Sequence, residues 1–350
     1  MSHEHANNRR TFIAGLATLG AGALLQGCRS ASPQPAASAA APHRIDVHHH
    51  VGPPTYVAAL ADKGVQQRPV IEWTPAKSLE DMDKGGVATA VASITTPGFS
   101  FVDAATARRL ARECNEYSTR LGRDYPGRFG LFAAVPMPDV DGTLAEIAYA
   151  LDTLKADGVG FFTSYGDKWL GDPAFTPVME ELNRRKAVAY THPTAPNCCR
   201  SLVPDIPPAV VEYGTDTTRT IASVVFSGTA ARFPDIRWIF SHAGGTMPFL
   251  TERFTRLPLQ NKSLESRVPN GVAYELKKFS YDIAQAAHPM ALASLLKLVP
   301  MSQIVFGTDF PFRASADHVK GLTDYGFSAS DLRAIDRDNA LKLLPRLRTA

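Results

Sequence analysis

RIDVHHH, at residues 44–50, is a short β-like apolar run that ends in three histidines. Side chains two residues apart on a strand point to the same side, so His48 and His50 can bind one ion while His49 points away. Two histidines in this spacing also occur by chance on protein surfaces, where they bind nothing. The pair therefore gains weight only if further candidate ligands stand at equivalent places in the chain.

Three further candidate ligands stand where an apolar run gives way to Pro, Gly or Phe-Pro. They are His192 in AVAYTHP, His242 in IRWIFSHAGG and Asp309 in QIVFGTDFP. A single histidine at a strand end often has only a structural role, satisfied by backbone groups. Five such residues in order favour a metal site instead, because barrel enzymes carry their chemistry at the carboxyl ends of the strands. The pattern predicts an α/β fold, a (β/α)8 TIM barrel of the metal-dependent hydrolase type.

Eight apolar runs alternate with helical segments, as expected of successive βα units. We predict strands at residues 44–50, 87–94, 129–135, 158–163, 187–192, 236–242, 278–283 and 303–308. A final helix at 331–344 closes the barrel. Two Pro-rich segments, 52–75 and 193–216, leave from candidate ligands, and we predict long loops there that form the roof of a pocket.

Length and charge limit the classes of function. The 350 residues suffice for one barrel, which takes about 250 residues, together with embellishments. The formal net charge is +3, and the folded part has no basic block interleaved with aromatic residues. This excludes a nucleic-acid footprint and leaves a small molecule as the expected partner.

The first 43 residues have the composition of processing signals rather than of a fold. In residues 1–28, two arginines at 9–10 precede a short apolar stretch, which is typical of a twin-arginine export signal, and LQGC, ending at Cys28, resembles a lipobox. The arginine pair can also be an ordinary basic n-region. The Ala/Ser/Pro-rich segment 29–43 has the composition of a flexible tether, and 44–350 is the predicted catalytic domain. We expect export, followed by lipid anchoring through Cys28 at a membrane or by cleavage to a free periplasmic form.

These motifs together resemble the amidohydrolase superfamily, in the branch of aminocarboxymuconate semialdehyde decarboxylase and of the resorcylate and methylsalicylate decarboxylases. The matching segments are IDVHHH at 45–50, THP at 191–193, SHAGGTMPF at 241–249 followed by Arg253, FSYDIA at 279–284 and FGTDFP at 306–311. The resemblance extends from about His43 to the end of the chain.

The resemblance implies a single divalent ion bound by His48, His50, His192 and Asp309, with His242 catalytic beside the metal-bound water. A role for His242 as a fifth ligand is the alternative. Binuclear relatives carry a bridging carboxylated lysine on the fourth strand, and GVGFFTS at 158–164 has no lysine. Three histidines with one carboxylate suit zinc, which is our first expectation, and also manganese.

An aromatic acid substrate needs a flat apolar slot and a cationic or amide anchor. The candidates for lining this slot are Phe162, Tyr165, Trp169, Asn197 and Phe312. Aromatic side chains also commonly pack in a core, which is the alternative for the four aromatic candidates.

Two further charged residues have candidate roles. Arg253 corresponds, by the resemblance, to a family arginine that binds the substrate carboxylate across a subunit interface, which implies a homodimer or a dimer-based oligomer. The alternative is a solvated charge on a helix between charged neighbours. Asp282 can fix the tautomer of a ligand histidine, or it can hold loop backbone.

The cysteines that follow Cys28 are Cys114, Cys198 and Cys199. Adjacent cysteines rarely form a disulfide because the bond requires a distorted peptide, and Cys114 lies in a predicted helix. We therefore predict no structural disulfide framework. Zinc binding by the adjacent pair is an alternative, although paired zinc ligands are usually two or more residues apart.

The resemblance predicts a metal-dependent, non-oxidative decarboxylase of a small hydroxyaromatic or unsaturated carboxylic acid, in which Asp309 supplies the proton that replaces CO2. The residues alone predict only metal-assisted chemistry on a small substrate. The first alternative is a hydrolase or hydratase of a lactone, ester or amide that uses the same ligands. The second is a membrane-tethered binding protein without turnover.

Overall fold

The computed structural model describes residues 42–200 and 202–348. The predicted signal peptide at 1–28, with Cys28, and most of the tether at 29–43 lie outside the described residues. Within the described part, no helix combines the length and the apolar character needed to cross a membrane.

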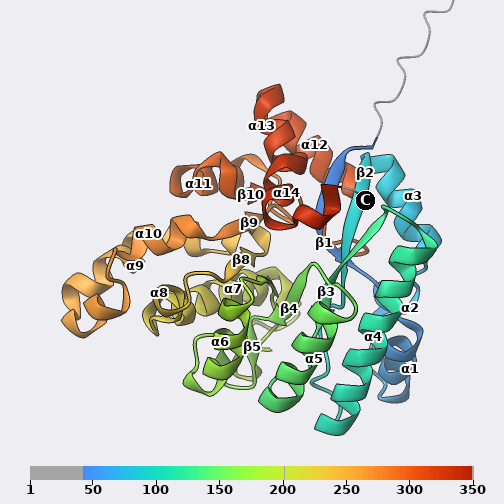
Figure 1. Ribbon diagram of the computed structural model, residues 1–350. Coiled ribbons are helices and arrows are strands. Elements are labelled where there is room, and N and C mark those ends of the chain that lie inside the picture. The colour runs from blue at the N-terminus through green and yellow to red at the C-terminus, as the bar shows by residue number, and fades with distance from the viewer. Residues whose placement is uncertain (1–41, 201, 349–350) are drawn as a thin grey trace, which may run out of the picture. The chain divides into compact units, whose positions relative to one another are not determined.

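Eight parallel strands form one sheet that curls into a barrel, with helices around it (Figure 1). In sheet order they are β1 (Arg44–His50), β2 (Val87–Ser93), β3 (Phe129–Ala134), β4 (Gly158–Phe162), β7 (Val188–His192), β8 (Arg237–Phe240), β9 (Ser280–Asp282) and β10 (Ile304–Val305). The predicted fold class, the number of strands and their order are confirmed. Apolar side chains fill the barrel between the strands, as in other closed barrels of this type.

The barrel closes between its first and last strands through backbone contacts rather than a regular ladder. The N–H of Val47 donates to the carbonyl of Phe306 at 3.0 Å, and the N–H of Asp309 donates to the carbonyl of His48 at 2.8 Å. The buried carboxylate of Asp46 accepts from the hydroxyl of Thr308 at 2.6 Å and from the backbone N–H of the same residue at 3.1 Å. We call this contact between β1 and the segment after β10 the closure seam.

Helices cover the outer face of the sheet. The larger ones are α3 (Pro75–Gly85), α4 (Ala104–Asp124), α5 (Val140–Asp152), α6 (Thr176–Arg184), α7 (Pro208–Phe226), α9 (Met247–Gln260), α11 (Pro289–Leu298) and α12 (Ser315–Tyr325). The shorter ones are α1 (Pro54–Asp62), α2 (Arg68–Ile71), α8 (Thr229–Arg232), α10 (Val272–Lys278), α13 (Ala329–Arg333) and α14 (Asn339–Leu343). In α4, for example, the side chain of Asp103 caps the first turn, and Leu110, Cys114 and Leu121 recur at helical spacing on the buried face.

The two predicted roof loops are wrong in part, because helices occupy much of both segments. Within 52–75 lie α1 and α2, and within 193–216 helix α7 begins at Pro208. In all three helices a proline stands in the first turn. Proline at this position loses no hydrogen bond and has a helical φ angle. The same prolines that read as loop signals therefore mark helix starts.

Two other predicted elements differ at the C-terminal end. The strand predicted at 303–308 ends at Val305, because the next N–H, that of Phe306, donates to the carbonyl of Ile335. The helix predicted at 331–344 is divided into α13, a π-helical turn at Ala334–Asp338, and α14.

The prediction of no disulfide is wrong for one pair. The sulphurs of Cys198 and Cys199 are joined in a disulfide within the 3-10 turn Asn197–Cys199. This turn brings the two adjacent sulphurs together, a local geometry that spacing rules do not reveal. Sulphurs bonded to each other are not thiolate ligands, so the zinc alternative for this pair has no support. Cys114 is free and buried.

Asp46→Ala should destabilise the barrel, because it removes the acceptor of several buried donors at the closure seam. Leaving such donors unpaired costs about 1–3 kcal/mol each, so we expect the free energy of unfolding to fall by at least about 3 kcal/mol. Urea denaturation of metal-free protein measures it. Asp62→Ala is the control, since the side chain of Asp62 is 75% exposed and its loss should change stability by less than about 0.5 kcal/mol. A loss below about 1 kcal/mol in Asp46→Ala would show that the seam does not depend on this carboxylate.

Candidate metal centre

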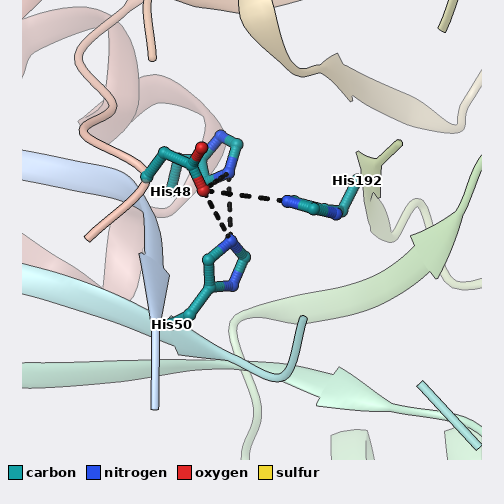
Figure 2. Close-up of side chains that lie close together, drawn as sticks. His48, His50 and His192 are labelled. Atoms are coloured by element: carbon teal, nitrogen blue, oxygen red, sulfur yellow. Dashed lines mark hydrogen bonds and ion pairs between the residues drawn. The ribbon is translucent and has the colours of Figure 1, made fainter. Parts of the chain in front are cut away.

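Four side chains meet at the carboxyl end of the barrel: His48 and His50 from β1, His192 from the end of β7, and Asp309 from the segment after β10. One ligand atom from each lies within 4.8 Å of all the others (Figure 2). His49 lies outside this cluster, and its Nε2 is 2.8 Å from the hydroxyl of Ser78 in α3. The four residues predicted as ligands are therefore brought together by strands that are distant in sequence.

Each of the three imidazoles is held through its Nδ1 atom, so that its Nε2 atom points into the cluster. The Nδ1 of His192 must donate to the carbonyl of Pro193, 2.8 Å away, because a carbonyl only accepts. The Nδ1 of His50 lies 3.1 Å from the hydroxyl of Ser93. The Nδ1 of His48 lies 2.9 Å from a carboxylate oxygen of Asp282. Such contacts fix the tautomer and the ring orientation of metal-binding histidines.

The inward atoms have the spacing of ligands around one ion. The Nε2 atoms of His48 and His50 are 3.2 Å apart. From Oδ1 of Asp309 they lie at 3.2 and 3.1 Å, and Nε2 of His192 lies at 3.8 Å. Ligand atoms bound at about 2.0–2.2 Å to a shared ion lie roughly 3–3.6 Å from one another. The donor set therefore fits a single divalent cation.

The electrostatics of the cluster also favour a positive charge at its centre. Burial lowers the pKa of a histidine, and it brings the pKa of His50 to about 4 and that of His192 to about 3. At His48 burial acts in the same direction, but the carboxylates of Asp282 and Asp309 outweigh it and raise the pKa of His48 to about 10. Without an ion, a proton on His48 thus supplies the positive charge. A divalent cation would replace that proton, since metal ligands bind in their deprotonated form.

Asp309 is an ionised carboxylate held in a constrained turn. Burial would raise its pKa, but the charge of His48 and hydrogen bonds with the surrounding histidines outweigh burial and leave the pKa of Asp309 well below its usual value. Its backbone is left-handed, with φ +65°. His242 and Gln285, at the ends of neighbouring strands, are also left-handed, with φ of +52° and +56°. Such backbone is strained for residues other than glycine and clusters at functional sites.

His242 lies beside the cluster but does not complete it. Its Nε2 is 3.5 Å from Oδ2 of Asp309, which is long for a hydrogen bond, and it has no hydrogen-bond partner in the described part of the chain. Its backbone N–H donates to Oδ1 of Asp282 at 2.9 Å. Asp282 thus touches both His48 and His242, which is the arrangement expected of a carboxylate that orients a ligand. The catalytic role of His242 stays a prediction.

The residues predicted to line the substrate slot divide into two groups. The ring of Phe162 lies 6.1 Å from that of His192, and the ring of Phe312, 40% exposed, lies 6.1 Å from that of His50. Each of these two aromatic rings thus lies next to a ligand imidazole. Their contact with substrate stays a prediction.

The other predicted slot residues have different surroundings. The hydroxyl of Tyr165 accepts the N–H of Phe162 at 2.8 Å, and the indole N–H of Trp169 donates to buried Asp216 at 2.8 Å. Both belong to the hairpin of β5 (Ser164–Tyr165) and β6 (Lys168–Trp169), and these contacts hold the hairpin against β4 and α7. The side chains of Asn197 and Arg253 are exposed. Within 42–200 and 202–348, neither is in hydrogen-bond or ion-pair contact with the cluster.

Three residues near the centre were not predicted from the sequence. Ser93, which holds His50, ends its own strand and obeys the same strand-end rule as the ligands. The hydroxyl of Tyr213 is 3.1 Å from that of Thr96, and its ring is 6.2 Å from that of His192. It lies in the part of α7 that we predicted as loop. Gln285, whose amide nitrogen donates to Oδ2 of Asp309 at 3.0 Å, follows β9 and has no sequence signal.

The chain matches a known family over most of its length. The family model described as Amidohydrolase matches residues 45–346. The chain belongs to the amidohydrolase family. The match confirms the family that was predicted for this amidohydrolase from its histidine motifs.

Three similar proteins carry decarboxylase names. A decarboxylase from Aspergillus niger is 36% identical over 323 residues, covering 87% of this chain and 88% of the relative. The 6-methylsalicylic acid decarboxylase of Penicillium expansum is 34% identical over 316 residues, covering 87% and 97%. A crystal structure of dihydroxybenzoic acid decarboxylase from Polaromonas, with bound manganese and the inhibitor 2-nitroresorcinol, superposes with a TM-score of 0.77 at 20% identity, covering 88% and 98%.

Removing one ligand should empty the centre. His48→Ala and Asp309→Ala should each lose most bound metal and all measurable activity, because the site has four ligands and no spare one. Metal analysis of purified variants by mass spectrometry checks this. His288→Ala, which alters an exposed histidine outside the cluster, is the control and should keep its metal. Full metal content in either ligand variant would contradict the assignment.

Proposed function

We propose that this amidohydrolase is a metal-dependent, non-oxidative decarboxylase of a small hydroxyaromatic carboxylic acid. The observation that carries the proposal is the pairing of a complete cluster of three histidines and one aspartate with full-length relatives named as decarboxylases. The 6-methylsalicylic acid decarboxylase, at 34% identity, suggests a hydroxybenzoic acid as the substrate class. The hydrolase alternative would use the same cluster, but the names of these relatives do not favour it.

The proposed cofactor is one divalent ion. Neutral imidazoles with one carboxylate suit zinc, and they also accept manganese. The manganese bound in the Polaromonas enzyme favours manganese as the competitor to be tested first. Metal analysis of the protein purified without added metal would separate the two.

We propose distinct tasks for the residues of the site. A bound divalent ion supplies positive charge that polarises substrate oxygens. Asp309 is ionised, so it must first accept a proton, for which the phenolic hydroxyl of the substrate is the proposed source. Its Oδ2, turned toward His242, can then deliver this proton to the ring carbon that carries the carboxylate. His242, with its Nε2 unpartnered among the described residues, can steer the proton or the substrate oxygen.

The bonds of the proposed reaction balance without an oxidant. The proton forms a C–H bond at the ring carbon, the C–C bond to the carboxylate breaks, and its electron pair returns to the ring as CO2 leaves. The phenolate oxygen then takes up a proton from solvent water, which replaces the phenolic proton that Asp309 transferred to the ring carbon. Phe162 and Phe312, whose rings lie next to His192 and His50, would contact the flat ring and exclude water from it.

Metal-loaded protein, incubated with 6-methylsalicylate and with 2,6-dihydroxybenzoate, should release CO2 and the corresponding phenol from at least one of them. His242→Ala should keep its metal, because His242 is outside the ligand cluster, and should lose turnover by about two to four orders of magnitude. Gas-phase detection of CO2 and chromatography of the phenol measure the reaction. Products that contain an added water would favour a hydrolase, and loss of metal from His242→Ala would make His242 a ligand.

The proposed oligomer is a homodimer in which Arg253 reaches the substrate carboxylate of the partner subunit. Phe249, 87% exposed, lies one helical turn before Arg253 on α9, and Met290, 83% exposed, lies at the start of the adjoining α11. Large exposed apolar side chains on two contacting helices are consistent with a protein interface. A guanidinium also matches a carboxylate with two parallel hydrogen bonds.

Mixing Arg253→Ala protein with His48→Ala protein should restore activity that neither has alone. Each mixed dimer would contain one site with both defects and one site with neither. Random exchange of equal amounts should therefore give about a quarter of the wild-type rate. The rate is followed after subunit exchange has been demonstrated with tagged chains. Without recovery, Arg253 would act in its own subunit or outside any site.

A further inference from the structure

We propose that Gln285 is a positioning residue that sorts the two oxygens of Asp309, keeping one on the ligand cluster and the other free for proton transfer. Gln285 lies immediately after β9 and is not among the residues predicted for the site. Its functional meaning rests on the proposed decarboxylase activity, while its effect on the centre does not.

The two oxygens of Asp309 have different neighbours. Oδ1 lies 3.1 Å from Nε2 of His50 and 3.2 Å from Nε2 of His48, so it belongs to the ligand cluster. Oδ2 accepts from Nε2 of Gln285 at 3.0 Å and lies 3.5 Å from Nε2 of His242. An ionised carboxylate only accepts, so the amide of Gln285 must present its NH2 group. The hydrogen bond therefore holds Oδ2 on the side of His242.

The backbone of Gln285 is itself held in place. Its N–H donates to Nε2 of His318 at 3.0 Å, and Nδ1 of His318 lies 3.1 Å from the carbonyl of Ala314. Because that carbonyl only accepts, Nδ1 carries the proton and Nε2 is free to accept. His318 is completely buried in α12. A buried imidazole from α12 thus holds the left-handed backbone of Gln285, at φ +56°.

This chain of contacts has a defined chemical consequence. A carboxylate that can rotate freely is able to bind a cation through both oxygens. The hydrogen bond from Gln285 opposes that rotation, so Asp309 would bind through Oδ1 alone. Oδ2 would then remain available for a proton. Gln285 is exposed, so a substitution of its side chain is not expected to leave a cavity in the core.

The competing interpretation is that Gln285 only stabilises the turn after β9. The two interpretations predict different properties for the metal centre. A structural role predicts a change in stability alone. A positioning role predicts a change in how the ion is coordinated, and a fall in kcat rather than a rise in KM, because Asp309 acts in the chemical step.

The test compares Gln285→Leu, which keeps the bulk of the side chain and removes the donor, with wild type and with Gln303→Leu. Gln303 also donates through its amide, but to the backbone carbonyls of Lys277 and Lys278, outside the cluster. Each protein is loaded with Co2+, whose visible absorption bands weaken as its coordination number rises. Gln285→Leu should show weaker bands than wild type, and Gln303→Leu should not.

The same proteins are then assayed with 6-methylsalicylate and 2,6-dihydroxybenzoate. In Gln285→Leu we expect kcat to fall about 10- to 100-fold, the usual range for a residue that orients a ligand, with KM within about twofold of wild type. Gln285→Glu serves as a second variant of nearly the same shape, in which a carboxylate would face Oδ2 and repel it. Its loss of kcat should be at least as large.

An unchanged Co2+ spectrum together with kcat within about twofold of wild type in both Gln285 variants would overturn the proposal. Should wild-type protein decarboxylate neither acid, the proposed function fails, but the Co2+ spectra still decide whether Gln285 positions Asp309. If Gln285→Leu fails to fold, the spectrum of Gln285→Glu decides in its place.

Discussion

The closure seam between the first and last strands is the constraint on which the site depends. Asp46 and the backbone of β1 bind the segment after β10 directly, through Thr308 and Asp309. The same two segments carry three of the four candidate ligands. A barrel that opened at this seam would therefore lose its centre before it lost most of its core. The positions of these ligands therefore depend on a few hydrogen bonds at the closure seam rather than on the whole sheet.

The three ligand histidines are oriented by hydrogen-bond acceptors of three different kinds. A carboxylate holds His48, a hydroxyl lies against His50, and a backbone carbonyl holds His192. None of the three can rotate its Nε2 away from the cluster without losing a buried hydrogen bond, which costs roughly 1–3 kcal/mol. The rings are therefore arranged before any ion binds. This order reduces the reorganisation that metal binding would otherwise require.

Sequence reasoning reached the fold and the cluster because both follow a rule of position. Strand ends are visible as apolar runs that stop, and His48, His192 and Asp309 stand at such ends. The rule missed Ser93 by one position, because the observed strand β2 ends at Ser93 whereas the apolar run was predicted to extend to residue 94. It could not find Gln285, because nothing in the sequence reveals a left-handed turn stabilised by a histidine more than thirty residues away.

Other errors arose where one sequence feature is compatible with two local structures. Prolines at the starts of α1, α2 and α7 read as loop residues, although proline fits the first helical turn equally well. The extra turns of α7 bring Tyr213 beside His192, a contact that a predicted loop gave no reason to expect. Tyr165 and Trp169 were correctly located after β4, but their polar atoms bind Phe162 of β4 and Asp216 of α7.

The closure seam also fixes when the centre can form during synthesis. His50 and Asp309 touch across 259 positions of the chain. At about 5–20 residues per second, the ribosome adds the last ligand roughly 10 to 50 seconds after the first pair. Until then the early histidines have no carboxylate partner from the far end, and a chain terminated before residue 309 has an incomplete ligand set. A loaded centre would therefore be a property of finished chains, and retained metal would distinguish them from truncated ones.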